Sequence, residues 1–169
     1  MQTIKITGPE VEHMASLAAR SCFFSGFSVQ SFCLPAAGRI GDASYGVGYV
    51  KFDKILPLSK QEEFSDFLIV LDPQGLQEAV KHAKEKSIVI LNSAEKPNQA
   101  VLKKRKLKLY SLDATGIALN ALRKPAPDAV MLGALVKACN RLTSKAAKMA
   151  LGENRDLNLA LDEGFRNVK

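Results

Sequence analysis

Two uninterrupted apolar runs, each ending at a polar residue, constrain the fold of this chain more than any other feature. Residues 67–71 are all apolar and precede Asp72, and residues 88–91 are all apolar and precede Asn92. A strand that is apolar at every position is typical of a parallel sheet, in which helices cover both faces. The segment 74–85 lies between the runs and has helical spacing. Together they predict a parallel strand–helix–strand unit.

The other segments alternate between short strands and helices in the same way. This alternation predicts an α/β fold of three layers, with a mostly parallel sheet flanked by helices (Rossmann-like). No linker divides the chain, so residues 1–169 are expected to form a single domain. Gly8-Pro9 should end the first strand, and the small residues of 35–46 should form a loop. The expected strands are 2–7, 28–34, 47–53, 67–71, 87–92 and 107–112; the expected helices are 11–26, 74–85, 114–122 and 130–142, with one helix or a helix pair over 146–165.

The cysteines and histidines provide no local ligand set for a metal. Cys22, Cys33 and Cys139 are widely separated and no Cys-x-x-Cys pair occurs, so neither an iron–sulfur cluster nor a structural zinc site is indicated. All three are expected to be small buried hydrophobic side chains, and His13 is expected to be structural. Any electron carriers should therefore belong to other chains.

The sequence has no feature of a membrane or secreted protein. No apolar run approaches the roughly 18 residues of a membrane span, and the residues after Met1 lack the charged and then apolar build of a leader. The expected location is cytoplasmic.

The net charge is +7, and the one dense basic cluster is the run 103–108. This run is interpreted as a solvated face at a helix end, as a site for an acidic partner or anionic cofactor, or as a nucleic-acid contact. No aromatic residues are interleaved with the basic ones, which disfavours nucleic acid.

Short motifs follow one another in a fixed order through nearly the whole chain. They are the opening strand with its following glycine, a small-residue segment at 37–45, an apolar strand between two aspartates at 65–72, a strand ending in Asn-Ser at 89–93, an Asp-Ala-Thr segment at 112–118, a Met-Leu-Gly-Ala helix at 130–135, and a closing segment at 158–165. Together these segments resemble the gamma subunit (gamma domain) of the pyruvate/2-oxoacid:ferredoxin (acceptor) oxidoreductase family.

The resemblance implies a non-catalytic subunit of a multisubunit 2-oxoacid (pyruvate-type) ferredoxin oxidoreductase. Such an enzyme decarboxylates a 2-oxoacid oxidatively with coenzyme A and passes the electrons to ferredoxin. The implied partners are alpha, beta and delta-type subunits, which carry thiamine diphosphate, magnesium and iron–sulfur clusters, and ferredoxin through the complex. For this chain the resemblance implies contact with coenzyme A but no catalytic residue and no metal. It implies neither a nucleic acid nor a membrane as partner, and a homo-oligomer through the same interface is an alternative arrangement.

By position in these motifs, the residues expected to bind the cofactor are Gly8, Arg39, Gly41, Asn92 and Thr115. Each also has a structural interpretation. Arg39 could form a surface or interface ion pair, Asn92 could cap a following helix, and Thr115 could be a helix N-cap.

The first turn departs from the family's glycine-rich loop. After Gly8 the chain continues with Pro9, which has no N–H to offer a phosphate, and with Glu10 and Glu12, whose carboxylates would repel one. The turn has therefore either lost phosphate binding or retains it in an altered form. Ile40 and Asp113 also replace residues usual in the family, a glycine and a proline.

The predicted helix 130–142 is apolar nearly all round, so it must be buried inside the domain or covered by another chain. Part of this helix, or the loop around residues 39–45, is expected to form a subunit contact.

The sequence as a whole leaves three hypotheses for the function of the chain: an enzyme subunit, a structural or regulatory module of the same fold that has lost its ligand site, and an unrelated α/β protein with an acidic partner.

Overall fold

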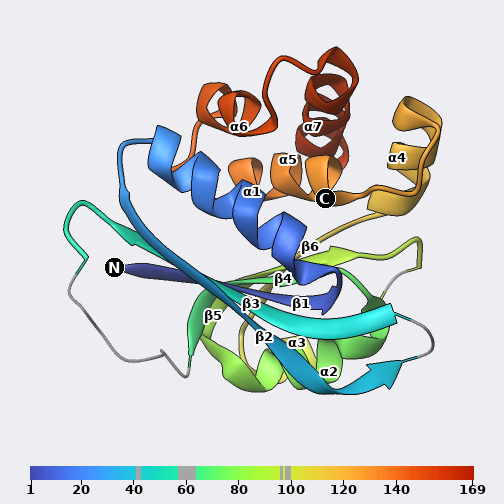
Figure 1. Ribbon diagram of the computed structural model, residues 1–169. Helices are drawn as coiled ribbons and strands as arrows, with labels where there is room; N and C mark the ends of the chain where they lie inside the picture. The colour runs from blue at the N-terminus through green and yellow to red at the C-terminus, as the bar shows by residue number, and fades with distance from the viewer. Residues whose placement is uncertain (41–42, 57–63, 96, 98–99) are drawn as a thin grey trace.

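The computed structural model describes residues 1–40, 43–56, 64–95, 97 and 100–169. Its centre is a six-stranded sheet with the order β2-β3-β1-β4-β5-β6, shown in Figure 1. The pairs β1–β4, β4–β5 and β5–β6 are parallel, whereas β2–β3 and β3–β1 are antiparallel. The strands are β1 (Gln2–Pro9), β2 (Ser28–Ile40), β3 (Ala43–Asp53), β4 (Ser65–Val70), β5 (Ala83–Asn92) and β6 (Lys108–Leu112).

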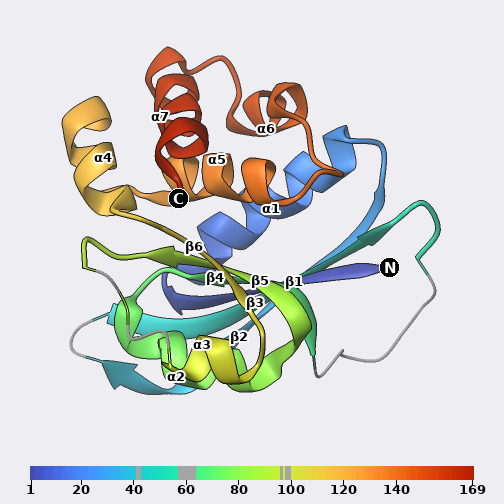
Figure 2. The same ribbon diagram turned by 180° about the vertical axis from the view of Figure 1, so that it is seen from behind.

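Helices cover both faces of this sheet, as Figures 1 and 2 show. One face carries α1 (Val11–Phe24) and α5 (Asp128–Ala138), and α6 (Ser144–Leu151) and α7 (Arg155–Asn167) form a further layer outside them. Beside α7 lies α4 (Ala114–Leu122). The other face carries α2 (Leu76–Ala79), between the 3-10 turns η1 (Pro73–Gly75) and η2 (Val80–His82), and α3 (Ala100–Lys104). The predicted α/β fold with flanking helices is confirmed. Within the described ranges, no helix has the length and apolar character needed to cross a membrane.

The two apolar runs form the central strands, as predicted. Side chains alternate between the faces of a strand, so Ile69 and Ile90 enter the core under α1 and α5, while Leu68 and Val89 enter the core under α2. These four side chains are essentially inaccessible to solvent. The hydrophobic effect on both faces thus explains why these strands are apolar throughout.

The apolar surface of helix α5 needs no other chain to cover it, so its pattern is no evidence for a subunit contact. Its residues from Ala129 to Val136 are all buried within the domain, because α5 lies between the sheet and the outer helix α7. Two helical layers stack on this face, and the sequence pattern of α5 alone cannot show that the second layer exists. The alternative contact, the segment 39–45, lies partly outside the described residues.

Two glycines allow α5 and α7 to approach each other closely. A Cβ atom on Gly133 of α5 would overlap the carbonyl oxygen of Leu161 in α7, and one on Gly164 of α7 would overlap the carbonyl oxygen of Val130 in α5. The backbones therefore touch where they cross. The glycine inside the predicted helix is required by this packing.

The segment 35–46, expected as a loop, is mostly strand. β2 continues to Ile40 and pairs with β3, with a register shift between Pro35 and Arg39. β1 likewise continues through Gly8 and Pro9, which pair with Gly46 and Tyr45. Small residues hide the alternation by which a strand is recognised in sequence, and a proline is tolerated at a strand end because its missing N–H breaks no ladder there.

The predicted helix 74–85 is also shorter than expected. Helical turns end at His82, and Ala83 begins β5, where it pairs with Ser65. The buried residues Leu76, Ala79, Val80 and Ala83 have the spacing of an amphipathic helix. Ala83, however, is buried as a strand residue, so the pattern extends past the real end of the helix.

Glycines follow the ends of two helices, one of which, at Gly26, was predicted. Gly26 follows α1 with a φ of 84° and Gly152 follows α6 with a φ of 79°, conformations that favour glycine. Gly152 thereby divides the tail into the helix pair α6 and α7. Helix α4 has the predicted bounds, 114–122.

Candidate functional site

Asn92 is the central residue at the carboxyl ends of the parallel strands. Its Nδ2 group donates to the carbonyl oxygen of Leu71 at 3.1 Å and to Thr115 Oγ1 at 2.9 Å. Its Oδ1 atom accepts from the N–H groups of Ala114 at 2.9 Å and Thr115 at 3.3 Å. An asparagine amide has two donor hydrogens and two acceptor positions, so this buried side chain is fully engaged by its own chain.

Thr115 is not the N-cap of α4, as one interpretation of the sequence had it. The N-cap is Asp113, whose carboxylate accepts from the N–H of Gly116 at 2.8 Å. Asn92 binds the N–H groups of Ala114 and Thr115 and so completes the first turn from a neighbouring strand. The general preference for aspartate as an N-cap could have identified Asp113 in the sequence. The interpretation of Asn92 as a cap of a following helix is correct, although that helix is α4 and not the next helix in the chain.

Gly8 lies in the same row of residues at the carboxyl ends of the strands, on the other side of Leu71. The carbonyl oxygen of Thr7 accepts from the N–H of Leu71 at 2.9 Å, and a Cβ atom on Gly8 would come within 2.7 Å of Leu71 Cβ. Gly8 has a φ of 139°. The glycine therefore permits close packing of β1 against the end of β4, and three of the five predicted site residues, Gly8, Asn92 and Thr115, are brought together around Leu71.

The turn between β1 and α1 is closed by its own side chains. Glu10 has a left-handed backbone (φ 51°) and makes no side-chain cap to the helix. Val11 is buried, and its Cγ2 atom lies only 2.8 Å from the position that a Cβ atom on Gly46 would take. An apolar side chain thus packs against β3 directly after the turn.

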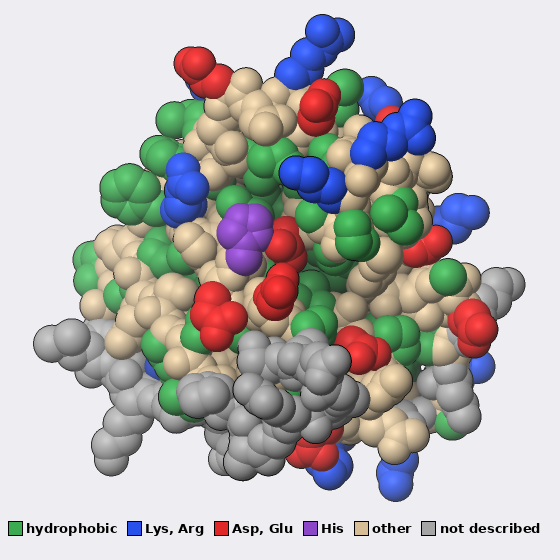
Figure 3. Space-filling model, turned by 45° about the vertical axis from the view of Figure 1, so that its right-hand side comes forward, with side chains coloured by type: hydrophobic (Ala, Val, Ile, Leu, Met, Phe, Trp, Pro, Cys, Tyr) green, Lys and Arg blue, Asp and Glu red, His purple; other side chains and the backbone are tan. Residues whose placement is uncertain are grey.

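Carboxylates surround this turn. Glu10 and Glu12 are exposed, and Asp128 at the start of α5 binds Nδ1 of the exposed His13 at 2.6 Å. Figure 3 shows acidic side chains gathered around a histidine on this side of the molecule. His13 is therefore structural in the sense that it joins α1 to α5, although it is not buried. The local field disfavours an anion at the start of α1.

The two remaining predicted residues are not brought to this row in the described part of the chain. Arg39 belongs to β2, where its backbone pairs with Ser44, and its side chain is outside what the structure describes. Gly41 lies outside the described residues.

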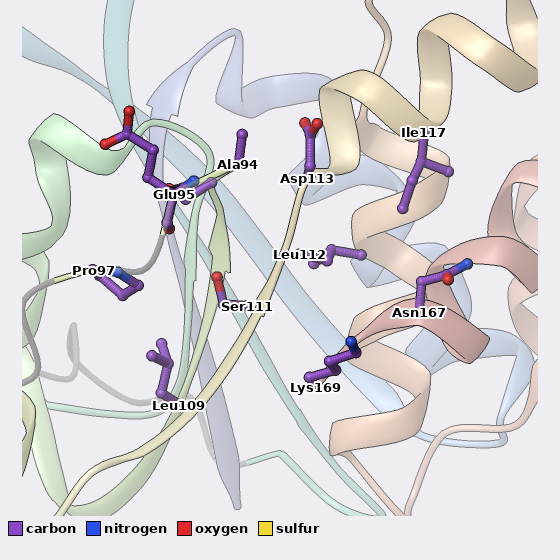
Figure 4. A pocket seen from close by; sticks show the side chains of 11 residues that line it. Ala94, Glu95, Pro97, Leu109, Ser111, Leu112, Asp113, Ile117, Asn167 and Lys169 are labelled. Carbon is purple, nitrogen blue, oxygen red and sulfur yellow. Dashed lines mark hydrogen bonds between the residues drawn. The ribbon is translucent and has the colours of Figure 1, made fainter.

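A hollow of about 520 Å³ lies beside Asn92, at the edge strand β6. It extends around both sides of Ser111, with Leu109 and Pro97 on one side and Leu112 and Asn167 on the other, as Figure 4 shows. The backbones of Ser111 and Lys169 exchange hydrogen bonds of 2.9 and 3.4 Å. This contact joins residues far apart in the sequence, so sequence analysis missed Asn167 and Lys169.

The opposite face of β1 and β3 carries a buried polar cluster. Lys5 is 4% exposed, and its Nζ atom lies 5.6 Å from the centre of the Tyr49 ring. Burial lowers the pKa of Lys5 to about 8, against the smaller opposing pull of Glu78. Burial also raises the pKa of Tyr45, and the charge of Asp72 adds to this. Lys5 is buried and Tyr45 half-buried, and both lie on the face of the sheet away from α1.

Two of the three cysteines, Cys22 and Cys139, are buried small side chains, as predicted, and the third, Cys33, is only half-buried. All three are free thiols. Burial raises the pKa of each thiol, so they remain protonated near neutral pH. Among the described residues, no group of three or more histidine, cysteine or acidic side chains is placed to hold a metal.

The basic run mostly faces solvent, but one member is structural. Arg105 donates from one guanidinium nitrogen to the carbonyl oxygens of Val80 and Lys81 at 2.8 and 2.9 Å, which ties α3 to the end of η2. Lys106 pairs with Glu85 at 3.1 Å, with both side chains exposed. The interpretation of the run as a solvated helix end agrees with these contacts.

Comparison with known proteins identifies the relatives of this chain. The family model described as pyruvate ferredoxin/flavodoxin oxidoreductase matches residues 11–162. The "Pyruvate/ketoisovalerate oxidoreductases common subunit gamma" of Thermococcus kodakarensis is 31% identical over 143 residues, which cover 82% of this chain and 77% of the relative. The protein of the same name from Pyrococcus abyssi is 32% identical over 143 residues, covering 81% and 76%. The "Pyruvate synthase subunit PorC" of Methanothermobacter marburgensis is 31% identical over 123 residues, covering 71% and 66%.

Solved structures share the fold. Pyruvate oxidoreductase subunit PORC of Thermotoga maritima superposes with a TM-score of 0.81 at 22% identity, covering 99% of this chain and 97% of the other. The 2-oxoglutarate:ferredoxin oxidoreductase of Magnetococcus marinus superposes with a TM-score of 0.78 at 18% identity, covering 98% of this chain but 30% of that one. The same domain is thus found both as a separate chain and as part of a longer one.

Proposed function

The chain belongs to the pyruvate ferredoxin/flavodoxin oxidoreductase family, and from this membership we propose that it is the gamma subunit of a multisubunit 2-oxoacid:ferredoxin oxidoreductase. The observation that carries the proposal is the match to separate gamma subunits over most of both chains. The reaction is the coenzyme A-dependent oxidative decarboxylation of a pyruvate-type 2-oxoacid, with ferredoxin as the electron acceptor.

We propose that this subunit carries no catalytic group of its own. Its thiols are protonated near neutral pH and separated, and the described residues offer no cluster of metal ligands. Thiamine diphosphate, magnesium and iron–sulfur clusters are therefore assigned to alpha, beta and delta-type partner subunits. The working location is taken to be the cytoplasm.

We propose that coenzyme A contacts this chain at most weakly through the row at the carboxyl ends of its strands. Gly8, Arg39, Gly41, Asn92 and Thr115 are the residues that the family motifs suggest for this contact. Two features of the row support a weak contact: the hydrogen-bonding groups of Asn92 are occupied, and Glu10 and Glu12 lie at the helix start. The 2-oxoglutarate:ferredoxin oxidoreductase of Magnetococcus marinus, which shares this fold, binds coenzyme A, and this supports coenzyme A as the ligand.

The test is purification of the tagged chain under native conditions from its own cells. Thiamine-binding and cluster-bearing partner chains should be recovered, and the assembly should reduce ferredoxin with pyruvate and coenzyme A. The isolated chain should be colourless and inactive. Turnover by the isolated chain, or recovery of no partner, would contradict the proposal.

A second candidate is a structural or regulatory module that has lost its ligand site. The packing of Val11 against Gly46 favours it, because a buried apolar side chain occupies the turn that the family motif fills with glycines. One measurement distinguishes the two candidate functions. An assembly prepared without this chain should lose activity or bind coenzyme A more weakly in the first case, and should differ only in stability or control in the second.

A further inference from the structure

A pair of adjacent aromatic side chains is exposed at the end of α1. Phe23 is 64% exposed and Phe24 38% exposed, and their rings meet edge to face with centres 5.7 Å apart. The buried stripe of α1 runs through Met14, Ala18 and Cys22 and leaves both phenylalanines outside it. The core therefore does not account for them.

A hollow continues from Phe24 across the neighbouring helix α6. Phe24 and Met149 line it together, and its volume is about 680 Å³. Met149 is 49% exposed. We call Phe23, Phe24 and Met149 the aromatic patch. Large exposed apolar groups that meet in a hollow are typical of protein interaction sites, and aromatic residues are prominent among those that dominate binding energy.

The rim of the aromatic patch is basic. Lys145 lies one turn before Met149 on α6 and lines the hollow, and Arg20 lies one turn before Phe24 on α1. Both side chains are at least partly exposed, and neither has an ion pair with another described residue. Lys148 also lines the hollow but is bound to Asp162 at 2.7 Å. Glu153 is the acidic residue in the lining.

From this arrangement we propose that the aromatic patch receives an amphipathic acidic segment of a partner subunit. Apolar side chains of the segment fill the hollow against Phe24 and Met149, and its carboxylates pair with Arg20 and Lys145. A second copy of this chain is a poorer occupant, because it would bring the same unpaired cations to the contact. The inference rests on the proposed function in one respect, that the partner is another subunit of the same assembly.

One test needs no substitution and uses methionine oxidation. Peroxide should oxidise Met149 in the isolated chain, because its side chain is accessible, and should oxidise it at least about tenfold more slowly in the assembly. Met14 and Met131 are fully buried and should be slow in both, whereas Met1, 42% exposed, reports general access. Equal oxidation of Met149 in both states would overturn the inference.

Substitutions provide the second test. The double variant Phe23→Ser, Phe24→Ser and the double variant Arg20→Glu, Lys145→Glu should each reduce recovery of partner subunits by about tenfold, as expected for central contacts. The matched controls are Leu119→Ser, which changes an exposed apolar residue of α4, and Lys124→Glu, which changes a cation elsewhere on the surface. Urea unfolding of each isolated variant identifies any that fail to fold.

The outcomes separate this inference from the proposed function. If the wild-type chain recovers no partner, the proposed function and the inference both fail. If the wild type recovers partners and the patch variants do so equally well, the inference alone fails. Dimerisation of the isolated wild-type chain that the patch substitutions abolish would identify a second copy as the occupant and would also overturn it.

Discussion

The Nδ2 group of Asn92 and the Oγ1 atom of Thr115 are joined by a hydrogen bond of 2.9 Å that links the end of β5 to the first turn of α4. The same asparagine binds two backbone N–H groups of that turn and the carbonyl oxygen at the end of β4. The edge at which α/β proteins usually bind ligands is therefore held together here by the chain itself.

Replacing Asn92 by alanine should destabilise the protein by about 2–4 kcal/mol, because several buried backbone and side-chain groups lose their partner at once. Urea unfolding measures the loss. Asn154→Ala is the control: Asn154 caps α7 at an exposed position through one hydrogen bond at 3.1 Å, and its loss should cost about 1 kcal/mol. Equal effects of the two substitutions would contradict the central role of Asn92.

Replacing Gly133 or Gly164 by alanine should force α5 and α7 apart. The added methyl group would meet backbone atoms, which cannot rotate away, so a loss of about 3 kcal/mol is expected, at the upper end for overpacking. Gly152→Ala is the comparison. No atom lies within 4 Å of its Cβ position, and only its backbone (φ 79°, ψ −165°), which residues other than glycine rarely adopt, opposes the substitution, at about 1–3 kcal/mol. Denaturation midpoints should rank the three variants accordingly.

The buried amine of Lys5 should make stability depend on pH in the alkaline range. Its pKa is about 8 in the folded chain against 10.5 for an ordinary lysine, so between these values the unfolded chain binds more protons and stability rises with pH. The variant Lys5→Met, which buries no charge, should be more stable than the wild type at pH 7 and should lose this advantage by about pH 10.5. Urea unfolding between pH 7 and 10.5 measures the difference, with Lys124→Met as the exposed control. Parallel curves for wild type and Lys5→Met would show that the amine is not desolvated.

Binding of coenzyme A to the isolated chain should be weak, with a dissociation constant of about 1 mM or higher, because Pro9 offers no N–H and the carboxylates repel phosphate. The double variant Pro9→Gly, Glu10→Gly should bind more tightly by calorimetry. It should also relieve the left-handed backbone of Glu10, which costs a non-glycine residue about 1 kcal/mol. Micromolar binding by the wild type would indicate that another part of the chain holds the anion.

Predictions of strands and helix ends from the sequence were most reliable where one physical effect dominates a whole segment. Burial on both faces makes the strands containing Ile69 and Ile90 apolar throughout, and both were predicted. Gly26 marks the end of α1 because its backbone conformation favours glycine. The order of the motifs along the chain also indicated the family, since several short segments rarely occur in the same order by chance.

Features that depend on distant partners were missed. The strand character of 35–46 results from pairing with β3, since its small residues show no alternation. The burial of α5 depends on α7, which crosses it through Gly133 and Gly164. At the candidate site, three of the predicted residues do converge, but the saturation of Asn92 depends on the position of α4 relative to β5.

The position of α5 between the sheet and α7 has a consequence for how the chain is made. A ribosome synthesises α5 before α7, so the apolar surface of α5 is without its outer cover until residues 155–167 have left the exit tunnel. Domains are aggregation-prone while such surfaces are open. Folding of this domain is therefore completed only after α7 has emerged, and ribosome-associated chaperones have their greatest opportunity to bind the chain just before that point.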